Sequence, residues 1–106
     1  MFKFHIENES IEINKRDKGS LALSLGNYNF KEHDKIELIV THETNLVFIK
    51  KGELDRNLIF FNFDEKDTEN IEEGCYKYSI VVTTDDFKTT IISCRDFILK
   101  GGCVDG

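Results

Sequence analysis

Apolar and polar residues alternate along most of this chain, with the period of two that is typical of β-strands burying one face. In the first half, the apolar side of the alternation falls on four groups of positions: Phe2, Phe4 and Ile6; Ile11 and Ile13; Leu21, Leu23 and Leu25; Ile36, Leu38 and Val40. Further strands are expected over residues 45–49, 57–63, 75–83, 88–93 and 96–99. About nine short strands at roughly ten-residue spacing predict an all-β sandwich or barrel.

Turn-forming residues separate these strands, since glycine, asparagine and aspartate tolerate turn geometry. One helix is expected, a short turn near residues 67–72 with Asp67 or Thr68 as its N-cap. The clearest strand boundaries lie at Gly26 and Asn27, at Gly52 and Asp55, and at Asp85 and Asp86.

The strand over 75–83 follows a polar segment that ends at Gly74, where glycine lets the chain bend sharply. Tyr76 and Tyr78 then fall on the inward face of the strand. Buried tyrosines usually keep the hydroxyl hydrogen-bonded at a rim. A tyrosine near the start of a late strand resembles the corner tyrosine of immunoglobulin-like sandwiches. An antiparallel immunoglobulin-like sandwich of about seven to nine strands is therefore the expected fold.

The chain has 106 residues, which suits one small domain. We expect that domain over residues 1–100, followed by a flexible tail over residues 101–106. No segment approaches the roughly 18 apolar residues of a membrane helix. The N-terminus lacks a basic start followed by an apolar run, so we expect no secretion signal. We expect the protein to be made in the cytoplasm.

The net charge of −6 comes from 20 acidic and 14 basic residues. An acidic surface repels phosphate backbones, so the charge argues against non-specific nucleic-acid binding. It also disfavours anionic membrane surfaces. Neither nucleic acid nor membrane is therefore an expected partner.

The three cysteines, Cys75, Cys94 and Cys103, are an odd count in a chain without a secretion signal, which argues against a disulfide framework. They are too far apart in sequence for the close pairs of zinc sites. We expect Cys75 and Cys94 to be small buried residues of strands. Cys103, in a glycine-flanked tail, would be reactive if exposed.

Candidates for catalysis are few. His5, His33 and His42 stand in no motif with a nucleophile. The acidic run over 64–73 lacks the order of a calcium loop and is interrupted by Lys66. No glycine-rich phosphate loop is present. The sequence therefore predicts a protein that is not an enzyme and holds no metal or cofactor.

Two of the expected strands, 45–49 and 57–63, are apolar on both faces. Strands that are apolar on both faces are covered on both faces. A two-layer sandwich covers only one face of each strand. The chain also contains no proline, one of the usual guards of exposed sheet edges. The second face is covered either by loops of this chain or by another chain. On the second interpretation, the expected contact residues are Leu46, Phe48, Leu58 and Phe60.

The order of these elements resembles the small immunoglobulin-like domain at the N-terminus of phage baseplate upper proteins, and its free-standing versions in phages of Gram-positive bacteria. Its Tyr-x-Phe-x-x-x-Asp element is matched by Tyr28, Phe30 and Asp34. His33 stands where that family often has glycine, and the chain lacks the long C-terminal extension of the larger relatives. A second element, Asp-Thr followed by Gly-x-Tyr-x-Tyr, is matched by Asp67, Thr68, Gly74, Tyr76 and Tyr78.

The resemblance implies a non-enzymatic structural protein of a tail or baseplate, present in the virion and made in the host cytoplasm. Its partners would be other tail, baseplate or capsid proteins, or further copies of itself. Two alternatives remain open. One is a soluble immunoglobulin-like module that binds a carbohydrate or protein, or inhibits a host protein. An enzyme is the other.

Overall fold

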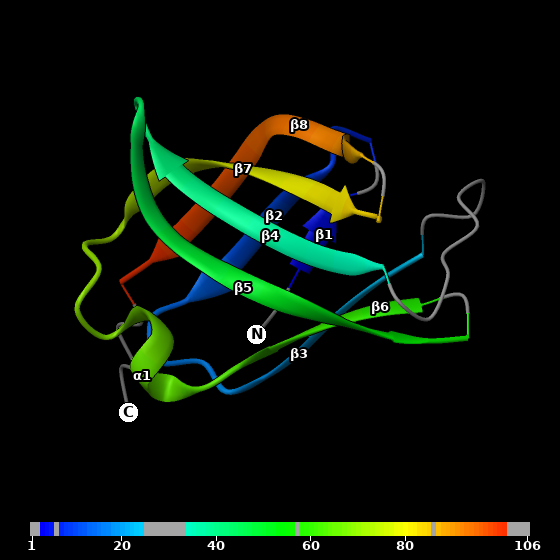
Figure 1. Ribbon diagram of the computed structural model, residues 1–106. Helices are drawn as coiled ribbons and strands as arrows, with labels where there is room; N and C mark the ends of the chain where they lie inside the picture. Colours follow the sequence, from blue (N-terminus) through cyan, green and yellow to red (C-terminus); the bar gives the residue numbers. More distant parts are fainter. Residues whose placement is uncertain (1–2, 6, 25–33, 57, 86, 102–106) are drawn as a thin grey trace.

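The computed structural model describes residues 3–5, 7–24, 34–56, 58–85 and 87–101. They form eight strands and one short helix, and the strands join into a single sheet that curls over itself (Figure 1). The prediction of an all-β fold is confirmed. The strands are β1 (Lys3–His5), β2 (Ser10–Asn14), β3 (Gly19–Ser24), β4 (Lys35–His42), β5 (Asn45–Asp55), β6 (Leu58–Phe63), β7 (Gly74–Thr83) and β8 (Lys88–Lys100).

The order of strands across the sheet is β1-β2-β8-β7-β4-β5-β6-β3. All neighbours are antiparallel except β2 and β8, which run parallel, with Ile11 opposite Phe97 and Ile13 opposite Leu99. The expectation of a wholly antiparallel sheet is wrong at this pair. Parallel neighbours need a long connection, and here the whole of β3 to β7 lies between them in sequence.

Strand β5 joins the two halves of the sheet. Its first part pairs with β4, and residues 52–55 pair with β6. Figure 1 shows it as one long curved green ribbon. A Cβ atom on Gly52 would lie 2.9 Å from side-chain atoms of both Ile59 and Phe61, so glycine permits this close approach. Gly52 lies within β5 and not in the turn expected over residues 50–57, and the chain turns later in that stretch, at Arg56, whose φ is +59°.

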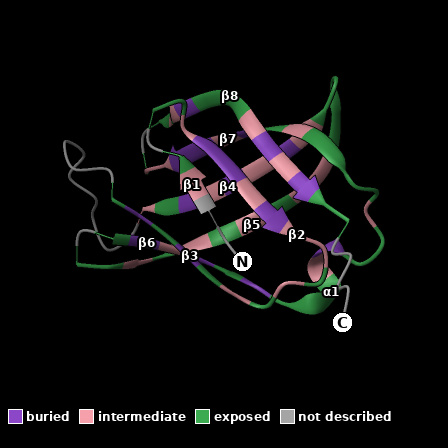
Figure 2. Cartoon of the chain, turned by 180° about the vertical axis from the view of Figure 1, so that it is seen from behind, coloured by how far each residue is buried: buried purple, intermediate pink, exposed green. Residues whose placement is uncertain are grey.

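The core lies between the two halves of the curled sheet, and Figure 2 shows buried positions on strands of both. Alternate residues of β2, β4 and β7 face inward, as the period of two predicted. They meet inward-facing residues of β3 and β6. The largest fully buried side chains include Tyr78, Phe61, Phe97, Ile11, Ile13, Leu38, Ile59 and Ile80.

Helix α1 covers only Glu65–Thr68, so it begins two residues before the expected range. The cap is Asp64 instead of Asp67 or Thr68. The carboxylate of Asp67 accepts the Asp64 backbone N–H, which completes a capping box. Thr68 is buried, and its hydroxyl accepts the Arg16 backbone N–H at 2.8 Å. The helix therefore holds the turn that leads into β3.

Strand β8 is continuous where two separate strands were expected. A bulge interrupts it at Cys94, whose φ is +52°. Both Cys75 and Cys94 are exposed, so the expectation that they are buried is wrong. Cys75 lies on the opposite face of β7 from Tyr78, and Cys94 occupies the bulge, where the alternation of faces is broken. Cys103 lies outside the described residues.

Candidate interaction surface

The structure places the four expected contact residues in three different environments. Leu46 is 60% exposed on the outer face of β5. Phe48 points inward, edge-on to the rings of Phe63 and Phe97, and packs against the core. Leu58 and Phe60 share the outer face of β6, where Leu58 is 39% exposed and Phe60 is half-buried. Only the last two form a pair.

Ala22, Leu58 and Phe60 form an apolar strip across β3 and β6, which we call the β6 strip. Ala22 is directly opposite Phe60 and exposed. Polar groups border the strip. The Ser20 hydroxyl donates to the Asn62 side chain, whose amide nitrogen donates to Glu53 at 3.2 Å. Apolar side chains within a polar rim are typical of surfaces that bind other proteins.

The β6 strip lies beside an edge of the sheet. Within the described part of the chain, β3 pairs with β6 alone. Leu21 and Leu23 face the core, whereas Ser20, Ala22 and Ser24 are exposed. The backbone groups of β3 directed away from β6 therefore have no described strand as a partner. Unpaired edge groups can accept a further strand.

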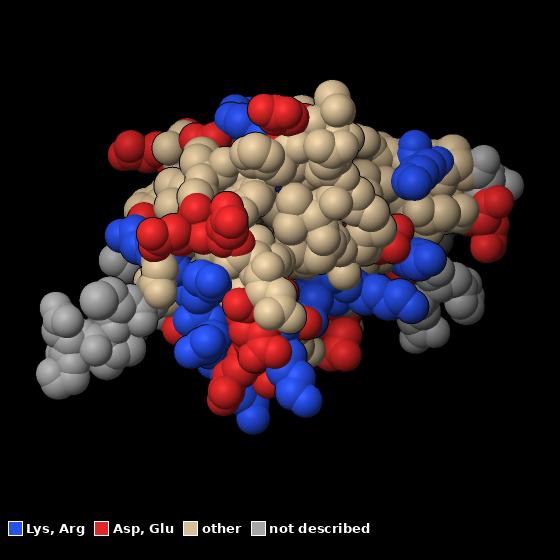
Figure 3. Space-filling model, turned by 90° about the vertical axis from the view of Figure 1, so that its left-hand side faces the viewer, with Lys and Arg blue, Asp and Glu red and all other residues tan. Residues whose placement is uncertain are grey.

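A second apolar area lies on the outer face of β4 and β5. Ile49 is 46% exposed and opposite Ile39, with Leu46 farther along β5. Figure 3 views the side of the molecule that carries this hairpin and α1. Charged side chains gather in its lower part, and a broad uncharged area lies above them. This second area fits a surface that contacts protein.

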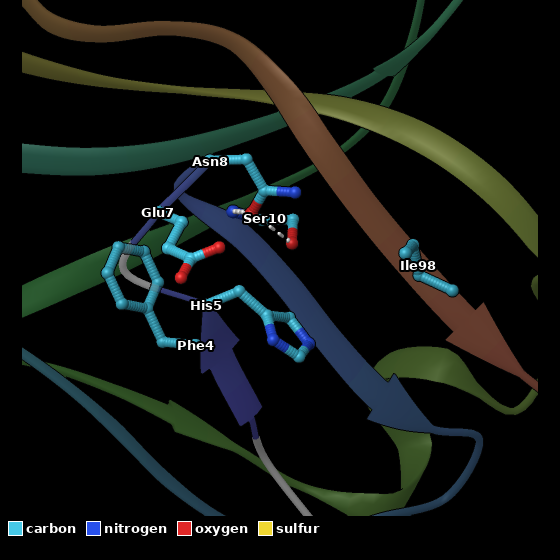
Figure 4. A pocket seen from close by; sticks show the side chains of 6 residues that line it. All are labelled: Phe4, His5, Glu7, Asn8, Ser10 and Ile98. Atoms are coloured by element: carbon cyan, nitrogen blue, oxygen red, sulfur yellow. Dashed lines mark hydrogen bonds between the residues drawn. The ribbon is translucent and has the colours of Figure 1, made fainter.

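An open hollow of about 640 Å³ lies at the turn between β1 and β2 (Figure 4). The Ser10 hydroxyl donates to the Asn8 carboxamide at 2.8 Å, and the Ser10 backbone N–H donates to the same oxygen at 3.1 Å. Both bonds shape the turn, so this serine is not poised as a nucleophile. The hollow is lined by Phe4, His5, Glu7, Asn8, Ser10 and Ile98.

A smaller hollow of about 440 Å³ lies between the β4–β5 hairpin and the segment leading into β7. His42 and Tyr76 meet there edge to face, with ring centroids 5.4 Å apart. The Tyr76 hydroxyl donates to the Glu72 carbonyl. Burial and the nearby Glu72 carboxylate raise the pKa of Tyr76, so its hydroxyl remains a donor. This arrangement fixes the segment before β7.

Other residues singled out in the sequence have structural roles. Tyr78 is fully buried, and its hydroxyl donates to the Glu9 carbonyl, as expected for a tyrosine hydrogen-bonded at a rim. Burial raises its pKa strongly. Gly74 begins β7, and Asp34 immediately precedes β4. Asp67 pairs with Lys50 at 2.5 Å. Tyr28, Phe30 and His33 lie outside the described residues.

The exposed thiols of Cys75 and Cys94 lie near the ion pair of Lys77 and Asp96, whose charged atoms are 2.5 Å apart. In the described part of the chain, no three residues of the metal-binding types cluster to hold an ion. Nor does any described helix have the length and hydropathy to cross a membrane.

Sequence reasoning missed Ala22 and Ile39. Ala22 is small and gives no signal by itself. The absence of charged residues between Gly19 and Ser24 was the feature that could have pointed to an interaction surface on this strand. Ile39 stands on the polar phase of an alternating strand, and an apolar residue there marks a second apolar face.

No protein-family model, no curated protein and no solved structure matches this chain.

Proposed function

We propose that this chain is a non-enzymatic structural protein of a phage or phage-derived particle, in its tail or baseplate, that contacts neighbouring subunits through the β6 strip. The observation that carries the proposal is the strip itself. Leu58 and Phe60 hold apolar side chains at the surface of a strand whose inner face is fully used by the core. Apolar groups held in this way favour burial by another protein.

The strand order supports an immunoglobulin-like sandwich. In that fold, strands C, F and G form one sheet and B, E and D lie in the other. Here β4, β7 and β8 are adjacent, as C, F and G would be. β3, β6 and the end of β5 are adjacent, as B, E and D would be. The parallel strand β2 takes the place of strand A, beside β8 instead of β3.

The segment before β7 supports the same fold. A corner tyrosine bonds its hydroxyl to backbone a few residues upstream, and Tyr76 does so at Glu72. The resemblance to the phage domain rests partly on this segment, because Asp67, Thr68 and Gly74 precede Tyr76 in it. The Asp67 carboxylate accepts hydrogen bonds from Lys50 and the Asp64 backbone, and the Thr68 hydroxyl accepts one from the Arg16 backbone. These residues thus support the fold and leave contacts to other surfaces.

The second apolar area fits an assembly role because it lies away from the β6 strip. Leu46 lies near the start of β5 and Leu58 at the start of β6, whose pairing partner is Asp55 at the far end of β5. A protein with two separate apolar surfaces can contact two neighbours in a closed symmetric assembly. The same proposal places the chain in the virion. Its partners there are further copies of this chain or other tail, baseplate or capsid proteins.

Purified phage-like particles from the source bacterium test the proposal by quantitative peptide mass spectrometry. We expect this chain at a fixed copy number relative to tail proteins. Phe60→Asp should reduce its incorporation, because it places a charge in the strip. Asp85→Asn, in the exposed turn after β7, should leave incorporation unchanged. Absence from particles, with abundant soluble chain, would contradict the proposal, as would equal incorporation of both variants.

A soluble binding module is the second candidate, and the exposure of Phe87 favours it. This ring is 62% exposed in the turn between β7 and β8, and sugar-binding sites stack aromatic rings on ligands. A glycan array probed with the purified chain distinguishes the candidates. Binding abolished by Phe87→Ala would support the module, and an array without binding would remove it.

A further inference from the structure

Strand β3 lacks the features that normally prevent edge strands from pairing. Natural edges are short, charged, interrupted by bulges, or contain proline. β3 has six residues with the sequence GSLALS, which includes neither charge nor proline. Its register with β6 is continuous from Gly19 to Ser24. The strand is therefore uncharged and free of bulges over these six residues, so it can accept another strand.

We propose that β3 pairs in antiparallel fashion with β3 of a second copy of this chain, about a two-fold axis at Ala22. This interaction goes beyond the role proposed above and does not depend on a phage particle. A two-fold interface uses the same surface on both copies. It joins the β5-β6-β3 half of each sheet to that of the other copy.

The alternation of faces restricts the register of such a pair. Residues directly opposite in antiparallel strands point to the same face of the sheet. An axis at Ala22 sets Leu21 opposite Leu23 on the inner face. On the outer face it sets Ser20 opposite Ser24 and Ala22 opposite itself. Side chains of similar size and polarity then meet on both faces.

The charges at the two ends of β3 do not oppose this pairing. The turn before β3 contains three cations and one anion, in the sequence KRDK over residues 15–18. At the other end, Ser24 is adjacent to Leu58, and Leu58 to Asp55. That end carries Asp55 and the cation Arg56, whereas Glu53 lies level with Ala22, because both are opposite Phe60. Antiparallel pairing therefore directs the basic turn of each copy toward an end with one anion and one cation, and not toward a second basic turn.

The β6 strip becomes part of a larger surface in this dimer. Ala22 and Phe60 of each copy occur in adjacent strands, and neighbouring strands are about 4.8 Å apart. The two strips therefore meet at the axis. A contact made by one six-residue strand is small compared with stable interfaces. We expect a reversible dimer with a dissociation constant in the micromolar range or weaker.

Analytical ultracentrifugation of the purified chain, from micromolar to millimolar concentrations, tests the proposal. Wild type is expected to shift from monomer to dimer. Ala22→Lys and Ala22→Glu should each weaken dimerisation about tenfold or more, since like charges then lie directly opposite. An equal mixture of the two variants should dimerise, because opposite charges then meet at the axis. Thr90→Lys, a matched charge on the exposed side of β8, should dimerise like wild type.

Three results would overturn the proposal: a wild type that stays monomeric throughout, a dimer that Ala22→Lys leaves intact, and a mixture that fails to restore pairing. Circular dichroism of each variant establishes that it is folded, which is expected because Ala22 is exposed. Particle incorporation is measured separately, so failure of the dimer and failure of the phage assignment give different results.

Discussion

The two edges of the sheet are built in opposite ways. β1 has three residues and includes Lys3 and His5. β3 has twice that length and no charged residue. Short length and charge both discourage pairing with other chains. The molecule therefore protects the β1 edge by its sequence and leaves β3 without such protection.

The two ends of the sheet also differ in what holds them. At the β1 end, Glu9 receives a hydrogen bond from Tyr78 on its carbonyl, and its carboxylate lies 3.1 Å from Arg95. At the β3 end, Leu21 and Leu23 are buried in the core. The neighbouring β2 is anchored by Ile11 and Ile13, but β1 itself places only the partly buried Phe4 against the core, and elements with little apolar burial open more readily. An edge anchored by the core keeps its shape without a partner, as a docking strand requires.

Removing a buried side chain that anchors the β3 end should cause the largest loss of stability. Phe61 is fully buried on β6 and opposite Leu21 of β3. Phe61→Ala is expected to lower the free energy of unfolding by about 3–5 kcal/mol, because it removes buried apolar surface and leaves a cavity. Urea denaturation followed by circular dichroism measures the change.

The adjacent Phe60 provides a matched control. It points outward and is half-buried, so Phe60→Ala should cost only about 1 kcal/mol. Equal losses for the two variants would mean that β6 does not have a core face and an outer face, and the β3 end would then not be anchored as described.

Loss of one hydroxyl should loosen the opposite end by a smaller amount. Tyr78→Phe removes the donor to the Glu9 carbonyl and should cost about 1–2 kcal/mol. Amide hydrogen exchange should accelerate in β1 and β2 but not in β3. Tyr76→Phe is the control, since its bond to Glu72 lies at an exposed site where water can replace it. Faster exchange in β3 equal to that in β2 would remove the distinction between the two ends.

Much of the fold follows from local sequence, because alternation is a property of neighbouring residues. The inward faces of β2, β4 and β7 were predicted correctly from this period alone. The parallel pairing of β2 with β8 leaves no such signal, since it depends on which apolar faces meet across the core. Gly52 was ambiguous for the same reason. Glycine is needed at this position because Ile59 and Phe61 approach the backbone closely. In the sequence, a glycine needed for close packing cannot be told from a glycine in a turn.

The structure separates the four expected contact residues, and a bulge explains part of this arrangement. Val40 is opposite Phe48, but Thr41 is opposite Leu46, so Val47 is an extra residue. The bulge reverses the alternation, which turns Leu46 outward and Phe48 inward. The apolar residues on both faces of this strand therefore indicated that one apolar face is exposed. They did not show which residues lie on that face. On β6, without a bulge, Leu58 and Phe60 share the outer face as alternation requires.

Charge should make the smallest contribution, and α1 is where it can be measured. Burial of Asp67 opposes its ionisation, but the Asp64 backbone N–H and the Lys50 ammonium outweigh burial and hold the pKa of Asp67 below its ordinary value. A carboxylate with a lowered pKa in the folded state stabilises the fold fully above the unfolded value. That contribution is lost as pH falls through the lower folded value.

Asp67→Asn keeps an oxygen for the Asp64 N–H and removes the charge beside Lys50. It should cost less than about 1 kcal/mol near pH 7, because the pair is partly exposed. The cost should shrink as pH falls through the lowered pKa of the folded state, because the wild-type carboxyl then becomes protonated as well. Urea denaturation at pH 7 and at a series of lower pH values measures this, with Asp85→Asn in the exposed turn after β7 as the matched control. A cost that rivals Phe61→Ala, or that persists in acid, would mean that the ion pair of α1, more than the core, holds β5 and the β3 end in place.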